Sequence, residues 1–376
     1  MRVVHVGKFY PPEYVGGLES VVVTLNDDLV RRGVGVSAVV AAVQGSGGVS
    51  EHRGVRVVRA PTLGTMLSQP LTPTFARAVR REAGDLLHLH HPNPLADWAA
   101  LSDRRPFIVT HHSDIVRQRA LRPLYRPLLA RALGRAAAVV VGSEQLRASS
   151  QDLAPVRDRV RVIPFGIDGA RFATTPEVAA RAASLRAGVG GRPVVLAVGR
   201  LVGYKGFDVL TRAARGLDAA VVIVGTGPDE ARLRAMAGPE VVFAGRVSDA
   251  DLVAWYHACD LFCLPSVSSA EAFGIVLLEA MACGRPLVTT ALPTGVAAVN
   301  RDGRTGLVVP PGDADALREA LRALLADPAR RRAMGEEART VQAREYGAAL
   351  MGERYLKLYE EVAAGGAAAP PVPGSR

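Results

Sequence analysis

Two glutamates eight positions apart, Glu271 and Glu279, enclose a short apolar segment and are well placed to bind an extended polar ligand. The segment enters through Phe273-Gly274 and continues from Ile275 as an apolar run, which predicts a loop and then a short helix. Eight helical residues rise about 12 Å, and the N–H groups at a helix start favour a diphosphate. The spacing therefore fits a nucleotide diphospho-sugar, with one carboxylate at the sugar and one at the ribose. Two solvated glutamates on an amphipathic helix are the alternative for this segment alone.

A loop further upstream supplies two positive charges. The apolar run 194–199 predicts a buried strand, and the loop after it carries Arg200 and Lys205. Parallel α/β sheets bind ligands at the carboxyl ends of their strands. An arginine and a lysine at this spacing can hold a diphosphate from two sides, and both side chains are expected to be partly solvated. A solvated basic loop without a ligand is the alternative interpretation.

Glycines in two further loops suit close contact with a ligand. Gly16 and Gly17 follow the first predicted strand, where a bare backbone can approach an anion or a sugar, although a plain turn is the simpler interpretation. Gly225 and Gly227 follow another apolar strand and form either a tight turn or a loop that binds the base. Neither segment matches GxGxxG or a P-loop, so a nicotinamide-binding Rossmann domain loses its main support.

Histidines gather at the ends of two predicted strands. His88, His90 and His91 lie at one strand end, and His111 and His112 lie at the other. A metal site is one interpretation of such a group, but no HExxH-type pattern with a carboxylate accompanies these residues. We therefore expect one histidine to contact the substrate and the others to line the site with polar atoms.

Two Asp-Ala-Asp sequences match the DxD pattern of metal-dependent sugar transferases. They span Asp249 to Asp251 and Asp313 to Asp315, and each precedes apolar residues at helical spacing. This arrangement is typical of a helix start that an aspartate caps. The three cysteines lack a zinc-binding pattern and are expected to be buried free thiols. The sequence therefore predicts no metal and no cofactor.

The chain length of 376 residues and the order of its apolar runs indicate two α/β domains. Strand-like runs alternate with helical segments and the series restarts near residue 168, which predicts two Rossmann-like, doubly wound units with parallel sheets. We expect domains over 1–168 and 169–344 and a disordered tail over 363–376. The expected strands are 3–6, 36–40, 55–59, 86–89, 107–110, 139–141, 160–163, 194–199, 220–224, 241–243, 261–264, 287–290 and 307–309.

The formal net charge of +10 comes almost wholly from arginine. It favours anionic partners such as nucleotide phosphates or acidic lipid headgroups, and the sequence carries no nucleic-acid-binding signature. No apolar stretch reaches the ~18 residues of a transmembrane helix, and no signal peptide is recognisable, so a cytoplasmic location is expected. Arginines interleave with leucines over 117–135. This indicates either a basic amphipathic face that lies on the inner side of the membrane or a helix packed on the first sheet.

Taken together, these features resemble glycosyltransferase family 4, whose members are retaining enzymes of the GT-B fold, with two Rossmann-like domains facing a central cleft. The resemblance covers roughly residues 1–362. The matching motifs, in chain order, are Gly16-Gly17, Thr-x-His at His112, Gly199-Arg200 with Lys205-Gly206, Glu271 with Glu279, and Asp-Gly-Arg-Thr-Gly-Leu-Val-Val-Pro at 302–310.

The resemblance implies a role for each matching residue. Arg200 and Lys205 would neutralise the leaving diphosphate, Glu271 would bind the hydroxyls of the donor sugar, and Glu279 would bind those of the ribose. His112 would contact the sugar from the other domain. Family members often carry Tyr or Phe before this histidine, and His111 stands there in this chain, which leaves the choice between the two histidines open. The other donor-binding positions would be Gly16, Gly17, Gly199, Gly225, Gly227, Phe273, Gly274 and Ile275.

The family also implies that each domain binds a different substrate. The first domain would bind the acceptor, and the second would bind the nucleotide sugar without a metal. A last helix, at about 345–362, would pack back on the first domain. The segment 112–118 resembles enzymes of bacterial polysaccharide biosynthesis, which favours mannose from GDP-mannose and a glycan or polyprenyl-linked acceptor. Alternatives are a UDP-sugar transferase with a soluble acceptor, a sugar-nucleotide epimerase of the same fold and a non-catalytic scaffold. An epimerase would turn over its nucleotide sugar without an acceptor, and a scaffold would lack one of the four donor residues.

Overall fold

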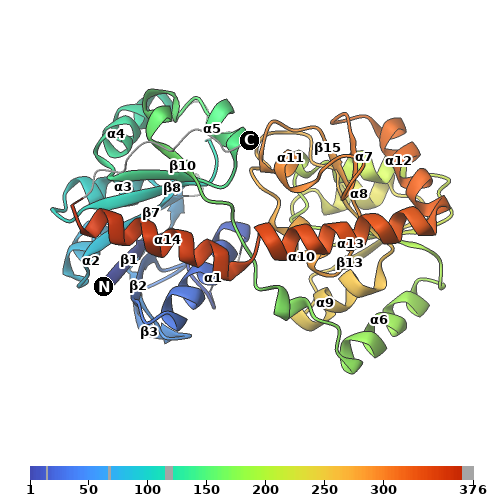
Figure 1. The fold of residues 1–376 in the computed structure, drawn as a ribbon, viewed down its shortest axis with the longest axis horizontal. Helices are drawn as coiled ribbons and strands as arrows, with labels where there is room; N and C mark the ends of the chain where they lie inside the picture. Colours follow the sequence, from blue (N-terminus) through green and yellow to red (C-terminus); the bar gives the residue numbers. More distant parts are fainter. Residues whose placement is uncertain (14–15, 67–68, 115–121, 366–376) are drawn as a thin grey trace. The chain divides into compact units, whose positions relative to one another are not determined.

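The computed structural model describes residues 1–376 apart from 14–15, 67–68, 115–121 and 366–376. It divides into two compact units, Met1–Gly166 with Ala348–Arg376, and Ile167–Gly347. Each unit is a mainly or wholly parallel sheet flanked by helices (Figure 1), as the alternating pattern of the sequence predicts. The chain returns to the first unit through α14 (Ala348–Ala363).

The first unit is built on an eight-stranded sheet in the order β10-β9-β8-β7-β1-β2-β4-β3. Neighbouring strands are parallel except for β3, which pairs antiparallel with β4 at the sheet edge. The sequence did not predict β3, because this mostly exposed strand has no apolar face. The strands are β1 (Arg2–Val6), β2 (Gly35–Ala41), β3 (Gly48–His52), β4 (Val55–Ala60), β7 (Leu86–His91), β8 (Phe107–His111), β9 (Ala138–Val141) and β10 (Val160–Val162), while β5 (Thr65–Met66) and β6 (Gln69–Pro70) form a separate pair.

Helices cover both faces of this sheet. Apolar residues on one face, such as Val4 and Leu87, form a core with α2 (Phe75–Arg81), α3 (Pro94–Leu101) and α4 (Arg122–Arg135). On the other face α14 packs against α1 (Gly17–Arg31), and side chains of α14 bond residues of β7 and β8. Because successive strand residues point to opposite faces, this arrangement decides which of the histidines lie together. The short helix α5 (Glu144–Ser149) follows β9.

The second unit contains a six-stranded parallel sheet in the order β13-β12-β11-β14-β15-β16. The chain starts at β11, adds β12 and β13 on one side, and then continues on the other side from β14. The direction of winding therefore reverses between β11 and β14, and doubly wound sheets bind ligands at the carboxyl ends beside such a reversal. The strands are β11 (Val194–Val198), β12 (Ala220–Val224), β13 (Val241–Gly245), β14 (Leu261–Leu264), β15 (Leu287–Thr290) and β16 (Gly306–Val309).

The helices of the second unit pack in two groups. In the first group, α7 contacts both α8 and α12, and Leu210, Leu317 and Leu321 lie in the core beneath them. In the second group, α6 packs on α9, and α10 packs on α13. The helices are α6 (Pro176–Gly188), α7 (Phe207–Ala213), α8 (Glu230–Met236), α9 (Asp249–Ala258), α10 (Ile275–Ala282), α11 (Gly295–Val299), α12 (Ala314–Ala326) and α13 (Pro328–Glu345).

Both Asp-Ala-Asp sequences lie at helix starts, as the sequence predicts. The Asp313 carboxylate accepts two backbone N–H groups in the first turn of α12 and so caps that helix. At α9 the detail differs, because Ser248 rather than Asp249 is the cap, and its hydroxyl accepts the N–H of Asp251. The capping interpretation is therefore right for Asp313 and displaced by one residue at α9.

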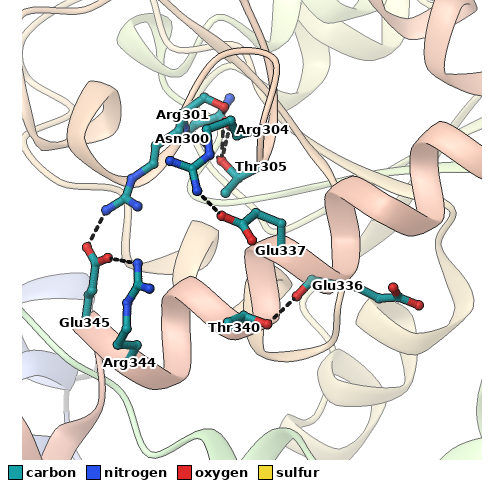
Figure 2. Close-up of polar contacts among 9 residues, drawn as sticks. All are labelled: Asn300, Arg301, Arg304, Thr305, Glu336, Glu337, Thr340, Arg344 and Glu345. Atoms are coloured by element: carbon teal, nitrogen blue, oxygen red, sulfur yellow. Dashed lines mark hydrogen bonds and ion pairs between the residues drawn. The ribbon is translucent and has the colours of Figure 1, made fainter.

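The family motif near residue 302 forms a turn that is held against α13 (Figure 2). Arg304 contacts Glu337 of α13, and Arg301 contacts Glu345 at the end of the same helix. Hydroxyl and amide groups within 300–305 bond one another at 2.9 Å and stiffen the turn. This motif therefore positions β16 and α13, which is a structural contribution to the second unit.

Candidate active site

The loop after β11 is fixed by contacts with the segment that follows β14. Val267 donates its N–H to the carbonyl oxygen of Tyr204 at 2.8 Å. Gly206 has a φ of +68°, and a Cβ at this position would lie 2.0 Å from the carbonyl oxygen of Pro265, so only glycine fits there. The two loops beside the reversal are thereby held together, and this brings Lys205 to the residues after β14.

Lys205 and Glu271 form a buried ion pair. Lys205 Nζ lies 2.5 Å from Glu271 Oε2, and the Ser266 hydroxyl donates to the same oxygen at 3.0 Å. Lys205 is only 9% exposed and Glu271 only 7%, so the expectation of a partly solvated lysine is wrong. Burial acts to lower the pKa of Lys205, but the Glu271 charge, Tyr204 and the hydrogen bond to Glu271 outweigh it and raise that pKa above its usual value. The site therefore holds a charged ammonium group.

Arg200 differs from Lys205 in its surroundings. It is exposed, as expected, and stands directly after Gly199, the glycine that follows β11. In the part of the chain that the structure describes, its guanidinium has no hydrogen bond or ion pair. A free guanidinium and a buried ammonium in one loop provide the two cations that a diphosphate needs.

The helix between the two glutamates begins later than the spacing argument assumed. Because α10 starts at Ile275, Glu271 lies in the preceding turn and Glu279 lies just over one turn inside the helix. The carboxylates are therefore not separated by eight helical residues. The cap residue of α10 is Gly274, with a φ of 78°, and within the described part of the chain no side-chain hydrogen bond caps the helix. The N-terminus of α10 thus keeps backbone N–H groups available for an anion.

Glu279 is oriented by Tyr256, a residue of α9 that the sequence did not single out. The Tyr256 hydroxyl donates to Glu279 Oε2 at 2.6 Å. Burial raises the pKa of Glu279 and outweighs the opposite effect of this hydrogen bond. Tyr256 is fully buried, so its hydroxyl fixes the carboxylate from inside the core. The sequence signal for this contact was a tyrosine, with its hydroxyl, at an otherwise apolar position of the helix.

Two of the predicted donor-binding glycines, Gly225 and Gly227, have a packing reason to be glycine. A Cβ at Gly225 would lie 2.0 Å from the carbonyl oxygen of Gly199, and one at Gly227 would lie 2.3 Å from that of Leu201. Glycine lets the backbones after β11 and β12 touch. Phe273 is buried and packs edge-on against Tyr346 at 6.2 Å between ring centroids, so it supports the loop from below.

Gly16 and Gly17 begin α1, Gly16 as its cap and Gly17 as its first residue. The nearby Glu19 is buried, which raises its pKa, while hydrogen bonds from the N–H groups of Glu19 and Gly16 and the charge of Lys8 oppose that rise. A glutamate that bonds the cap N–H is a capping arrangement. Among the residues that the structure describes, no atom would lie within 4 Å of a Cβ at Gly17, so their packing does not demand glycine there. Glu19 was not among the predicted site residues, although Gly-Gly-x-Glu at a helix start is a capping signal that the sequence shows.

Four histidines lie on the face of the first sheet that α1 and α14 cover. The parallel register places His5 beside His88 and His90 beside Thr110, and His112 follows β8 on the same face. His5 Nδ1 lies 3.0 Å from His90 Nε2, and His90 Nδ1 lies 3.1 Å from His112 Nε2. Burial lowers the pKa of His5 to about 3, and burial together with nearby histidines lowers that of His112 to about 3. Both rings are therefore neutral at neutral pH.

His88 joins this group to the C-terminal helix. Its Nδ1 lies 2.7 Å from the Tyr359 hydroxyl, and its Nε2 lies 2.6 Å from the hydroxyl of Thr110. The Thr110 oxygen in turn lies 2.8 Å from the Tyr355 hydroxyl. Two buried tyrosines thus anchor α14 to β7 and β8.

His91 and His111 point to the opposite face of the sheet. His91 Nε2 lies 2.5 Å from Asp97 Oδ1, and His111 Nε2 lies 2.9 Å from Asp114 Oδ1. Both histidines are buried. Because His111 is engaged with its own carboxylate, His112 is the better candidate for substrate contact.

Among the residues that the structure describes, two groups of side chains bring ligand-type atoms within 4.8 Å of one another. They are His5, His88 and His90, and His111, Asp114 and Asp152. In the first group both ring nitrogens of His88 and of His90 already bond protein atoms. In the second, the Ser150 hydroxyl and the His111 ring both lie against Asp114. Protein partners account for these contacts, and we assign neither group to a metal.

The arginine- and leucine-rich segment is only partly a surface feature. Leu129 and Leu133 of α4 lie in the core of the first unit, so the helix-on-sheet alternative is correct for them. Leu124 is 82% exposed, and Arg126 and Arg131 are exposed as well. The predicted part over 117–121 lies outside the described residues. Among the helices that could be searched, none has the length and apolar character needed to span a bilayer.

Two family profiles and a solved structure match this architecture. Glycosyltransferase Family 4 matches residues 15–171, and Glycosyl transferases group 1 matches residues 186–341. Sucrose-phosphate synthase from Thermosynechococcus elongatus superposes with a TM-score of 0.81, covering 97% of this chain and 100% of that one at 24% identity. The fold is therefore GT-B, a fold of two Rossmann-like domains, as predicted.

Similar proteins of known activity define the class of enzyme more closely than the fold does. O-antigen chain mannosyltransferase C of Escherichia coli is 35% identical, covering 96% of this chain and 98% of its own length. A D-rhamnosyltransferase of Pseudomonas aeruginosa is 36% identical over 90% of both chains. A GDP-mannose-dependent phosphatidylinositol monomannoside mannosyltransferase of Mycolicibacterium smegmatis is 35% identical, covering 75% of this chain and 78% of its own. A chain with this fold and these relatives is a glycosyltransferase, and it belongs to glycosyltransferase family 4.

Proposed function

We propose that this glycosyltransferase is a retaining hexosyltransferase that moves mannose from GDP-mannose to a glycan or lipid-linked acceptor. The observation that carries the proposal is the buried Lys205–Glu271 pair at the reversal between β11 and β14, four positions before the uncapped start of α10. Mannosyltransferases among the relatives, some of them GDP-mannose-dependent, support the choice of donor. The rhamnosyltransferase relative keeps other donor sugars as alternatives. A UDP-linked donor stays an alternative because the donor-site residues do not specify the base.

The donor site follows from the charges and dipoles of the second unit. Arg200 and Lys205 neutralise the diphosphate as it leaves, together with the N-terminus of α10. Glu271 binds hydroxyls of the sugar, and Glu279, oriented by Tyr256, binds those of the ribose. The departing phosphate takes the proton of the acceptor on the same face of the sugar, which gives retention.

The backbone around these side chains completes the proposed donor site. Gly199, Gly225 and Gly227 let the loops approach the nucleotide closely. Gly274 and Ile275 form the start of α10, where backbone N–H groups can bind the diphosphate. In the first unit, His112 contacts the substrate, and the helix start at Gly16-Gly17 offers backbone N–H groups of the first turn of α1 other than the Gly16 N–H, which Glu19 bonds. A metal has no role in this scheme, because the two cations supply the positive charge and the Asp-Ala-Asp sequences lie at helix starts.

We further propose that the acceptor is presented at an anionic membrane surface on which the first unit docks. The net charge of +10 and the exposed Leu124, Arg126 and Arg131 support this. Each basic side chain near such a surface contributes about 1 kcal/mol, and salt screens the attraction. A soluble acceptor is the alternative.

The donor assignment is tested by thermal unfolding with GDP-, UDP- and ADP-sugars. A ligand at a hundred times its dissociation constant stabilises a protein by about 2.7 kcal/mol. We expect GDP-mannose to raise the melting temperature more than UDP-glucose or ADP-glucose. A larger shift with UDP-glucose would replace GDP-mannose by a UDP-sugar, and turnover of the nucleotide sugar without any acceptor would favour an epimerase.

A further inference from the structure

Three imidazoles form a continuous hydrogen-bonded row that leads from β1 to His112. The row runs from His5 Nδ1 to His90 Nε2 at 3.0 Å, and from His90 Nδ1 to His112 Nε2 at 3.1 Å. The sequence explains the row, because β1 and β7 are paired in parallel and alternate residues of a strand share one face. All three rings are at least nine-tenths buried. None of the roles proposed above for His112 uses His5 or His90.

The row has only two consistent arrangements of protons. Burial lowers the pKa of all three rings, with nearby histidines adding to the effect at His90 and His112, so each imidazole is neutral and carries one N–H. Every bond between two ring nitrogens needs one donor and one acceptor. Either every N–H points along the row toward His112, or every N–H points toward His5.

The far end of the row selects between these arrangements. His5 Nε2 is buried and has no hydrogen-bond partner among the residues that the structure covers. If the N–H groups pointed toward His5, this atom would be an orphaned N–H, which is the rarer kind of unsatisfied buried group. If they point toward His112, the atom is a bare acceptor. The arrangement that points toward His112 is therefore favoured, and it leaves His112 with its hydrogen on Nδ1.

Packing holds the rings in the planes that the row requires. The His90 ring lies 4.3 Å from the His88 ring and 5.3 Å from the His5 ring, measured between centroids. The His112 ring stacks on Phe165 at 5.0 Å. Since His88 is itself bonded to Tyr359 of α14, the row rests on the anchored C-terminal helix.

We propose that His5 and His90 are positioning residues that hold His112 in the Nδ1–H tautomer, so that His112 offers a hydrogen-bond donor to a substrate oxygen. This ligand assignment rests on the proposed function, in which the substrates carry sugar hydroxyls. His112 in this state is a donor that orients the substrate, and it does not act as a base, because Nε2 is occupied by His90 and Nδ1 already holds its hydrogen.

The tautomer can be measured on the full chain without any substrate. The protein has eight histidines, and nitrogen-15 labelling of histidine followed by NMR distinguishes a protonated from a bare ring nitrogen. His112→Asn assigns the His112 signals by removing them. We expect His112 to show a protonated Nδ1 and a bare Nε2 at neutral pH. A protonated Nε2 with a bare Nδ1 would overturn the proposal, whatever the activity of the protein.

Replacements at His90 test the positioning role. His90→Asn keeps an N–H donor near the position of Nδ1, whereas His90→Leu removes it. We expect His90→Asn to preserve the His112 tautomer and most of kcat/KM, and His90→Leu to mix the tautomers and lower kcat/KM about tenfold. Melting temperatures of both variants separate this effect from misfolding. Loss of kcat/KM in His90→Leu with an unchanged tautomer would contradict positioning, as would unchanged values of both.

The two proposals fail in different ways. If GDP-, UDP- and ADP-sugars are all inert with the wild-type protein, the proposed function fails, while the tautomer measurement still decides the role of His5 and His90. If the protein transfers sugar normally and His112 has the opposite tautomer, only the positioning role is lost.

Discussion

Lys205 Nζ and Glu271 Oε2 lie 2.5 Å apart in a pair that is almost fully shielded from solvent. The two residues come from loops after β11 and β14, which meet where the winding of the second sheet reverses. Removing one member of a buried pair leaves an uncompensated charge. The Lys205 ammonium therefore has two roles: it stabilises the second unit by pairing with Glu271, and it supplies positive charge at the proposed diphosphate site.

Lys205→Ala should lower both turnover and stability. We expect turnover to fall by ~10²–10³, because one cation is lost beside the leaving diphosphate. Unfolding should become easier by about 3 kcal/mol, because Glu271 loses its partner. Steady-state kinetics and urea unfolding measure the two effects.

Matched variants separate charge from stability. Arg200→Ala should lower turnover by a similar factor of ~10²–10³ with little change in stability, since Arg200 is exposed. The double variant Lys205→Met with Glu271→Gln should recover most of the stability but no activity. Wild-type turnover in either single variant would rule out the diphosphate assignment.

Glu271 and Glu279 should fail in different ways. Glu271→Ala removes a contact to the reacting sugar and should mainly lower kcat, whereas Glu279→Ala removes a ribose contact and should mainly raise KM for the donor. Tyr256→Phe should resemble a weak form of Glu279→Ala, because it frees the carboxylate that Tyr256 orients. Donor titrations of the three variants provide the comparison. If Glu279→Ala raised KM no more than Glu271→Ala, the assignment of the two ends would be reversed.

The buried histidines should make the protein sensitive to acid. The pKa of His5 and His112 is about 3 when folded, against 6.5 without the fold. Between these values the unfolded chain binds more protons, so this contribution is complete above pH 6.5 and is lost as the pH falls toward 3. Each such histidine contributes a slope of up to about 1.4 kcal/mol per pH unit.

Urea unfolding at pH 7 and pH 5 measures this slope. His5→Asn and His112→Asn should each reduce the slope of the unfolding free energy with pH by up to the contribution of one histidine, about 1.4 kcal/mol per pH unit. The buried row would have no part in acid sensitivity if both variants kept the wild-type slope.

Transfer should persist in excess EDTA. The positive charge that a metal would supply comes from Arg200 and Lys205 in the proposed scheme. Activity is compared before chelation, after it, and after addition of magnesium or manganese. Loss on chelation with recovery on adding either ion would show that the two-cation scheme is incomplete.

Membrane docking should depend on charge and salt. Co-sedimentation with anionic vesicles is expected at low salt, with release at high salt, and neutral vesicles should bind little. Arg126→Glu with Arg131→Glu should weaken binding, while Arg332→Glu with Arg339→Glu, at two exposed arginines of the second unit, serves as a matched control. Equal binding to both vesicle types would remove the membrane proposal and favour a soluble acceptor.

Local signals in the sequence predicted most of the fold. The strands of both sheets follow continuous apolar runs, and Asp313 caps α12 as its position before a helical pattern indicates. The exposed β3 escaped prediction because it has no apolar periodicity. Leu129 and Leu133 were ambiguous, since a stripe that packs on a sheet and one that lies on a membrane have the same spacing.

The sequence predicted which residues belong to the proposed site better than it predicted the contacts between them. Lys205 was placed in the right loop, but its burial depends on a pairing with Glu271 across 66 positions of the chain, which spacing cannot reveal. The contact between Tyr256 and Glu279 was not predicted either, because it joins residues of two different helices and spacing does not show it. The separation of His112 from His111 depends on strand register, because alternation sends neighbouring residues to opposite faces.

The central claim is tested most directly by following labelled mannose from GDP-mannose in the presence of a glycolipid fraction from cells that produce the protein. We predict that the label enters the glycolipid with release of GDP in equal amount, and that the new linkage keeps the α configuration of the donor. Glu271→Ala should abolish the transfer. A β-linked product, or no consumption of GDP-mannose or of any UDP- or ADP-sugar under the same conditions, would contradict the account.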